Sequence, residues 1–271
     1  MYNFYVFLVF FRPFCTTFAR RNTENIVSKV VQSHGLVLHT IRYSDSQLIV
    51  SIFTEAAGTV PFLVRAARGS KNGPKASVWQ QLSQVDVAWE PRLRTNLQKP
   101  RELTLWKPWH SLPFDPAKTA MALFLGEFLY RALHNEQENV ALFQYLTNAL
   151  QWLDESEGGY ANFHLVVLLH LTRFLGFTPS TDEWTEGCYF DMQAATFTPQ
   201  QPSHPHFLAP AEAALLPKFL RMDLRSMRPV GLNGERRNRI LQLITEFYRL
   251  HIPEFPELHS LEVLAEVFAR A

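Results

Sequence analysis

Residues 35–75 read GLVLHTIRYSDSQLIVSIFTEAAGTVPFLVRAARGSKNGPK, and this stretch decides the fold of the N-terminal half. It alternates apolar and polar residues in short runs, separates them with tight turns, and ends in a group of cations. Alternation with a period of two is typical of half-buried strands. Because the stretch carries no nucleophile constellation, metal-ligand set or phosphate loop, it predicts a small β-structure that holds a polyanion and does no chemistry.

Five strands are predicted in and around this stretch. The first covers 30–43, as one long bent strand or a strand pair with Gly35 as the bulge or bend. The other strands are predicted at 47–54, 59–66, 80–89 and 101–107. Glu55 to Gly58 predicts a hairpin turn, and Pro61 restricts its strand to an edge or a bulge. Several short strands in such a span, rich in turns, are typical of a small barrel.

The pattern becomes helical after Pro113, where Asp115 is an expected N-cap and Pro116 an expected first helical residue. Helices are predicted at 116–134, 139–154, 160–176, 210–222, 233–251 and 260–269. The third is apolar almost all round, which predicts a central buried helix. The domain organisation is then a disordered extension or start-site artefact (1–26), a β-domain (27–110), and a helical domain (111–271) with an irregular insertion at 177–208.

Charge differs between the two halves. The chain has 271 residues, of which 47% are hydrophobic and 19% charged, so it can form a folded core. Residues 27–107 carry eleven Lys and Arg against five Asp and Glu, whereas residues 108–271 carry twelve against nineteen. This division favours two domains with different partners, although chance drift of surface charge is the alternative.

Location is constrained by cysteines and by the N-terminus. Cys15 and Cys188 cannot form a disulfide framework, which favours a reducing cytoplasm. The apolar run at 4–11 is far shorter than the roughly 20 residues that span a bilayer. Its cations follow it, whereas those of a signal peptide precede the apolar run. No membrane association is therefore expected.

Cations with nearby tryptophans form the main candidate site. Phosphate backbones are held by cations and unpaired bases stack on aromatic rings, so this combination favours a single-strand binder. The candidate DNA-binding residues are Arg65, Arg68, Lys71, Lys75, Arg92, Arg94, Lys99, Arg101 and Lys107, with Trp79, Trp89 and Trp106 nearby. The alternative is a solvated loop surface with tryptophans in the core.

A second group of arginines lies in the helical half, where phosphate, an acidic peptide or no ligand at all are equally good interpretations. It comprises Arg221, Arg225, Arg228, Arg236, Arg237 and Arg239. Two histidines of the buried helix, His164 and His170, are expected to be core or interface residues, because their spacing sets them on different faces.

Zinc is the metal that the cysteine and histidine residues of the insertion suggest. Cys188, His204 and His206 with Asp191 could supply ligands, but structural zinc sites usually use cysteine pairs. A buried cysteine that acts as a small hydrophobe is the preferred interpretation. The sequence also lacks a P-loop, a GxSxG elbow and an HExxH motif, so no nucleotide hydrolysis or hydrolase chemistry is indicated.

Four segments together resemble the bacterial recombination-mediator family RecO, from about Val30 to the C-terminus. They are LVLHTIRYSDSQLIVSIFTEAAGTVPFLV (36–64), PFDPAKTAMALFLGEFLYRAL (113–133), ANFHLVVLLHLTRFLGFTP (161–179) and NRILQLITEFYRLHIPEFPELHSLEVL (238–264). The resemblance implies an α+β protein, an N-terminal OB-fold barrel followed by an α-helical domain. It also implies a cytoplasmic, nucleoid-associated DNA repair protein that is not an enzyme.

The partners that the resemblance implies are single- and double-stranded DNA, RecR and the C-terminal tail of single-strand-binding protein. The implied role is to anneal complementary strands and to help RecA load onto coated DNA. Many family members carry a four-cysteine zinc module where this chain reads EGCYFDMQAATFTPQQPSHPHF, residues 186–207. Cys188 alone remains, so the insertion is interpreted as a degenerate zinc module and no cofactor is expected.

Two other functions stay open at this point. An OB-fold barrel can serve as a protein-interaction adaptor that does not bind DNA. A hydrolase or nuclease is disfavoured, because no acidic metal cluster or nucleophile constellation is apparent.

Overall fold

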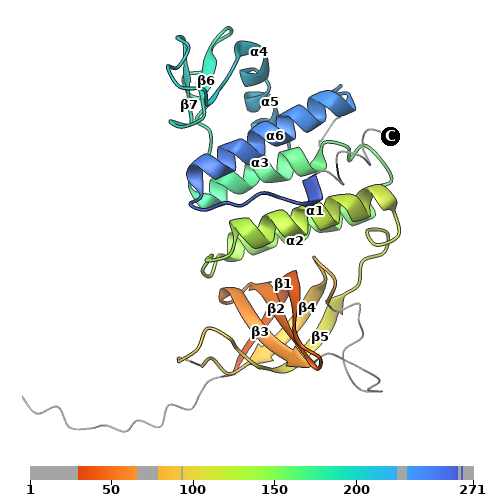
Figure 1. The fold of residues 1–271 in the computed structure, drawn as a ribbon. Coiled ribbons are helices and arrows are strands. Elements are labelled where there is room, and N and C mark those ends of the chain that lie inside the picture. Colours follow the sequence, from red (N-terminus) through yellow and green to blue (C-terminus); the bar gives the residue numbers. More distant parts are fainter. Residues whose placement is uncertain (1–29, 66–78, 93, 225–230, 262–263, 265–271) are drawn as a thin grey trace, which may run out of the picture.

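The computed structural model describes residues 30–65, 79–92, 94–224, 231–261 and 264, and Figure 1 shows their arrangement. A β-barrel lies at one end, with α1 and α2 next to it. Helices α3 and α6 form the following layer, and a small sheet with α4 and α5 lies at the far end. None of the helices in the described ranges has the length and apolarity needed to cross a membrane.

The barrel contains five antiparallel strands in the order β3-β2-β1-β4-β5. The strands are β1 (Val31–Ser44), β2 (Gln47–Thr54), β3 (Gly58–Arg65), β4 (Gln84–Trp89) and β5 (Pro100–Lys107). A parallel bridge between Phe62 and Gln98 brings β3 beside the start of β5 and closes the sheet. Five strands closed in this way form the partly open barrel of an OB-fold, as predicted.

Apolar side chains with a period of two fill the barrel interior. The interior cluster comprises Val37, Val50, Ile52, Phe62, Val64, Val85, Val87 and Trp89. Phe62 and Trp89 meet edge to face, with ring centroids 5.4 Å apart. Trp89 is only 2% exposed, so its prediction as a nearby platform for bases is wrong: it is part of the core.

The bulge predicted at Gly35 is displaced along the strand. Gly35 pairs regularly with Thr54, and the register shifts between Val37 and His39 instead. A glycine is needed at 35 for another reason, because a Cβ there would lie 2.5 Å from Cγ2 of Ile52.

Helices α1 (Pro116–Ala132), α2 (Val140–Glu155), α3 (Phe163–Leu175) and α6 (Gly234–His251) form the larger helices of the described chain. Asp115 caps α1 as predicted, accepting hydrogen bonds from the backbone N–H groups of Ala117 (2.8 Å) and Lys118 (3.1 Å). Every α3 residue from Phe163 to Thr172 is buried, and Gly176 ends this helix in the left-handed conformation at φ 83°.

The helix predicted at 210–222 is two short helices, α4 (Pro210–Ala213) and α5 (Leu216–Arg221). Pro217 explains the break, since it lacks an N–H and its ring would collide with the carbonyl of Ala213 in a continuous helix. The helix predicted at 260–269 lies largely outside the described residues.

The insertion at 177–208, predicted to be irregular, contains a three-stranded sheet. Its strands are β6 (Tyr189–Asp191), β7 (Thr196–Thr198) and β8 (Phe207–Leu208), in the order β7-β6-β8. Phe190 and Phe197 pack inside it with ring centroids 5.1 Å apart. Strands of two or three residues between prolines are too short to produce a readable alternation.

The barrel and the helices share one core. Leu36, Leu38 and Phe53 of the barrel belong to the same buried cluster as α1, α2 and α3. The barrel therefore packs an apolar outer face against the helices. This packing fixes how the barrel, and the loops at the ends of its strands, are oriented relative to the helical domain.

Candidate nucleic-acid interface

Three of the predicted cations meet at one groove of the barrel. Arg65 ends β3, while Lys99 and Arg101 lie at the start of β5. The groove, with a volume of about 360 Å³, is lined by Gln47, Leu63, Val64, Arg65, Trp79, Lys99, Pro100, Arg101 and Leu103. It therefore combines an apolar floor, which includes the Trp79 indole, with a cationic rim.

Gln98 does not line this groove but positions the chain that enters it, a role that the sequence does not signal. Its side chain is buried and closes the loop before β5: the Arg92 N–H donates to its Oε1 (2.8 Å), and its Nε2 donates to the Thr95 carbonyl (2.7 Å). Its backbone carbonyl accepts from Leu63 N–H at 2.8 Å, and its N–H donates to the Pro61 carbonyl at 2.9 Å. Lys99 is thereby held beside β3.

The three cations differ in how free they are. Arg101 forms an ion pair with Glu90, and both side chains are more than one-third exposed. Within the described part of the chain, neither Arg65 nor Lys99 has an ion-pair partner. Since exposed ion pairs are screened and weak, all three guanidinium and ammonium groups can engage phosphates.

The other candidate cations that the structure describes lie away from this groove. Arg92 borders a separate groove, between the barrel and the connection of α1 to α2. Arg94 is exposed in the loop between β4 and β5. Lys107 is at the opposite end of β5, about 20 Å from Arg101 at the usual rise per strand residue. Arg68, Lys71 and Lys75 lie outside the described residues.

The third tryptophan faces an acidic surface. Trp106 is 39% exposed and stacks on His34, with ring centroids 3.8 Å apart. His34 contacts Asp86 at 2.5 Å, and Glu102 lines the same hollow. Trp106 is not among the residues that line the groove, and the carboxylates near it disfavour bound phosphates.

The donor set proposed for zinc does not converge on one point. Cys188 is buried and contacts Thr185 Oγ1 at 2.9 Å. His204 pairs with Asp191 (3.2 Å), and His206 pairs with Glu246 on α6 (2.7 Å). Among the described residues, no group of three or more His, Cys, Asp or Glu could hold a metal ion. The donors therefore do not form the tetrahedral four-ligand site that a structural zinc ion needs.

The second arginine group is divided by the structure. Arg237 is buried and donates from Nε to Asn162 Oδ1 at 3.1 Å, and Arg239 pairs with Glu212 at 3.0 Å. Arg221 and Arg236 are exposed, whereas Arg225 and Arg228 lie outside the described residues. The histidines behave as predicted: both are buried, and burial lowers the pKa of His164 to about 3, so it is neutral.

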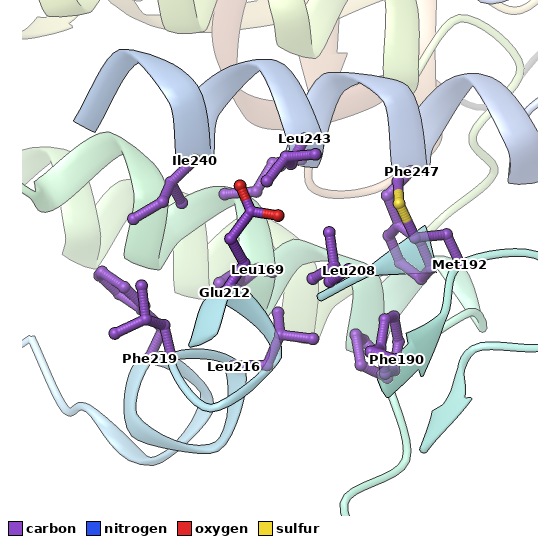
Figure 2. A pocket seen from close by; sticks show the side chains of 13 residues that line it. Leu169, Phe190, Met192, Leu208, Glu212, Leu216, Phe219, Ile240, Leu243 and Phe247 are labelled. Carbon is purple, nitrogen blue, oxygen red and sulfur yellow. The ribbon is translucent and has the colours of Figure 1, made fainter. Parts of the chain in front are cut away.

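An apolar cavity lies between α3, α5, α6 and the small sheet (Figure 2). Leu169, Phe190, Leu216, Phe219 and Phe247 are among its walls, and the Glu212 carboxylate is its one charged group. Its volume is only about 30 Å³, which has room for a water or two and is far smaller than a ligand pocket. We interpret it as a gap in the core.

Comparison with known proteins decides the family. Residues 28–109 match the model of the N-terminal domain of recombination protein O, and residues 113–262 match that of its C-terminal domain. The chain belongs to the RecO family. A DNA repair protein RecO from Phocaeicola vulgatus is 43% identical over 87% of this chain and 98% of its own length. The RecO proteins of Bacteroides fragilis (44%, 86% of this chain, 97% of theirs) and Flavobacterium psychrophilum (31%, 88% and 99%) are similar. A role in DNA repair and recombination follows.

Proposed function

We propose that this RecO-family chain is a non-catalytic mediator that binds single-stranded DNA in the groove between β3 and β5. The observation that carries the proposal is the meeting of Arg65, Lys99 and Arg101 around an apolar floor. The cations neutralise successive phosphates, while the floor accepts the faces of unpaired bases. Duplex DNA contacts the same cations through its backbone alone.

Strand annealing follows from the same physics. Two complementary strands repel each other, and cations that neutralise part of this charge lower the cost of bringing them together. No bond is made or broken, so the activity needs neither a nucleophile nor a cofactor. Membership of the RecO family supports three further parts of the proposal. The chain acts together with RecR, binds the C-terminal tail of single-strand-binding protein, and helps RecA load onto DNA. It does so in the cytoplasm, near the nucleoid.

The first test removes two of the cations. The Arg65→Ala, Lys99→Ala double variant should bind labelled oligo(dT) more weakly, as measured by fluorescence anisotropy. A plot of log K against log[salt] should become shallower by about 1.4, because each phosphate neutralised on a single strand contributes about 0.7.

The matched control is Lys107→Ala, Arg249→Ala, which removes the same charge from exposed positions away from the groove. It should keep nearly the wild-type slope. Equal slopes for the two double variants would mean that net charge, and not the groove, binds the strand. Absence of oligonucleotide binding by the wild type at 50 mM salt would favour a protein-interaction adaptor.

A second test concerns the insertion. We propose that the β6–β8 module folds without zinc, because its donors are engaged with separate partners. Protein purified without chelator should contain no stoichiometric zinc by mass spectrometry, and its Tm should not change on addition of EDTA. A structural zinc would behave differently, since its binding energy is folding energy.

A further inference from the structure

The C-terminal end of β1, next to the turn into β2, exposes two large apolar side chains. Ile41 is 44% exposed and Tyr43 is 62% exposed. Exposed apolar groups of this size gain nothing from folding, so their presence together at one turn suggests a ligand. Among the described residues, the one ion-pair partner of Arg42, between them, is Asp45 at a long 3.8 Å, and both side chains are largely exposed.

This turn adjoins the groove. Ser44 pairs with Gln47 across the turn, and Gln47 pairs in turn with Arg65. Gln47 and Arg65 both line the groove. Since neighbouring strands are about 4.8 Å apart, Tyr43 lies roughly 10 Å from Arg65 across two strand spacings. A stacked single strand covers that distance in about three nucleotides, at about 3.4 Å each.

The backbone also sets Tyr43 apart. The register between β1 and β2 shifts between Arg42 and Ser44, so Tyr43 is an additional residue in its strand. Irregularities of this kind re-aim a side chain away from the regular ladder. The exposed phenol ring of this bulged residue lies near the end of a cationic groove and can stack on a nucleic-acid base.

We propose that Tyr43 is a base-stacking platform that extends the single-strand path beyond Arg65 and favours unpaired over paired DNA. The inference rests on the proposed function of the groove. Stacking requires a base whose face is open, which a single strand offers and a duplex does not. A protein partner is the less favoured occupant, because one turn offers far less than the roughly 800 Å² per side of a stable interface.

The experiment compares Tyr43→Ala, Tyr43→Phe and the wild type on three ligands: oligo(dT), an abasic strand of equal length, and a duplex. Tyr43→Ala should bind oligo(dT) roughly 5- to 150-fold more weakly, the range expected for one lost base–aromatic stack. Its affinity for the abasic strand and the duplex should be unchanged. The salt slope should also be unchanged, because no charge is removed, and Tyr43→Phe should bind like the wild type.

Phe114→Ala is the matched control, since Phe114 is 79% exposed and precedes α1 in the helical half; it should bind all three ligands normally. An equal loss on oligo(dT) and on the abasic strand, or no loss on either, would overturn the stacking role while the groove stands. Failure of the wild type to bind oligo(dT) would overturn both proposals. Loss of a protein partner with normal oligo(dT) binding would assign the turn to protein docking instead.

Discussion

Replacing Gly58 with alanine should lower the free energy of unfolding by about 3 kcal/mol or more. Gly58 has φ +69°, which costs an L-residue roughly 1–2 kcal/mol. The added Cβ would also lie 2.1 Å from the Glu136 carbonyl oxygen and 2.5 Å from the Gln137 carbonyl carbon. Both are backbone atoms, so no side-chain rotation relieves the collision.

The collision matters because this turn joins the two halves. Thr59, next along the chain, donates from its N–H to the Glu136 carbonyl (3.0 Å) and from Oγ1 to the Leu133 carbonyl (2.6 Å). Pushing the turn away from the connection between α1 and α2 breaks these bonds as well. A Tm decrease of about 10 °C is expected by calorimetry, given about 2–4 °C per kcal/mol for a domain of this size.

Gly159→Ala is the matched control for Gly58→Ala. Gly159 has a similar φ of +75°, but an added Cβ there meets nothing within 4 Å. It should show only the backbone cost of about 1–2 kcal/mol. Equal losses of stability in the two variants would show that the turn at Gly58 does not press against the connection between α1 and α2.

The strands and the larger helices could be predicted because each depends on local pattern. A run rich in β-branched residues marks β2 (QLIVSIFT), and the Asp115-Pro116 pair marks the start of α1. What sequence could not show is contact across the chain. Gly58 reads as an ordinary turn glycine, and its restriction by Glu136 follows only from packing. Trp89 likewise reads as an available ring until the barrel closes around it.

The candidate site likewise depends on contacts between distant parts of the chain. Cations of the N-terminal half are visible in the sequence, but their grouping depends on the bridge between Phe62 and Gln98. That bridge brings β5 to β3 and puts Lys99 near Arg65, while the length of β5 carries Lys107 away. Tyr43 had no sequence signature, since an exposed and a buried tyrosine in a strand look alike. Its interest comes from its exposed fraction and its position beside Gln47.

Removing the Asp154 carboxylate should be nearly as damaging as Gly58→Ala, because it fixes the chain between the barrel and α1. Asp154 is 3% exposed, and its oxygens accept hydrogen bonds from the N–H groups of His110 (2.9 Å), Ser111 (2.8 Å) and Leu112 (2.8 Å). The buried Lys118 ammonium is held beside it, donating to the Asp154 backbone carbonyl at 3.0 Å. Asp154→Ala should cost about 3 kcal/mol or more, since it leaves buried donors unpaired beside an ammonium.

The pH dependence of stability gives a second measurement of the same carboxylate. Burial favours the neutral acid, but the backbone hydrogen bonds from His110, Leu112 and Ser111 outweigh it and hold the pKa of Asp154 below its usual value. Stability from a lowered pKa is present above the unfolded-state pKa of about 3.9 and is lost as pH falls through the folded-state value. Wild-type Tm should therefore fall more steeply below about pH 4 than that of Asp154→Ala.

Asp182→Ala separates this effect from loss of any carboxylate, because Asp182 is exposed and, among the described residues, its carboxylate accepts only a long hydrogen bond from Ser180 Oγ (3.4 Å). It should change stability by less than about 0.5 kcal/mol and leave the acid limb of the Tm curve as in the wild type. Parallel acid limbs for Asp154→Ala and the wild type would show that the carboxylate is not the anchor. In that case the orientation of the barrel would depend on the shared apolar core of Leu36, Leu38 and Phe53 and on the hydrogen bonds from Thr59 to the connection between α1 and α2.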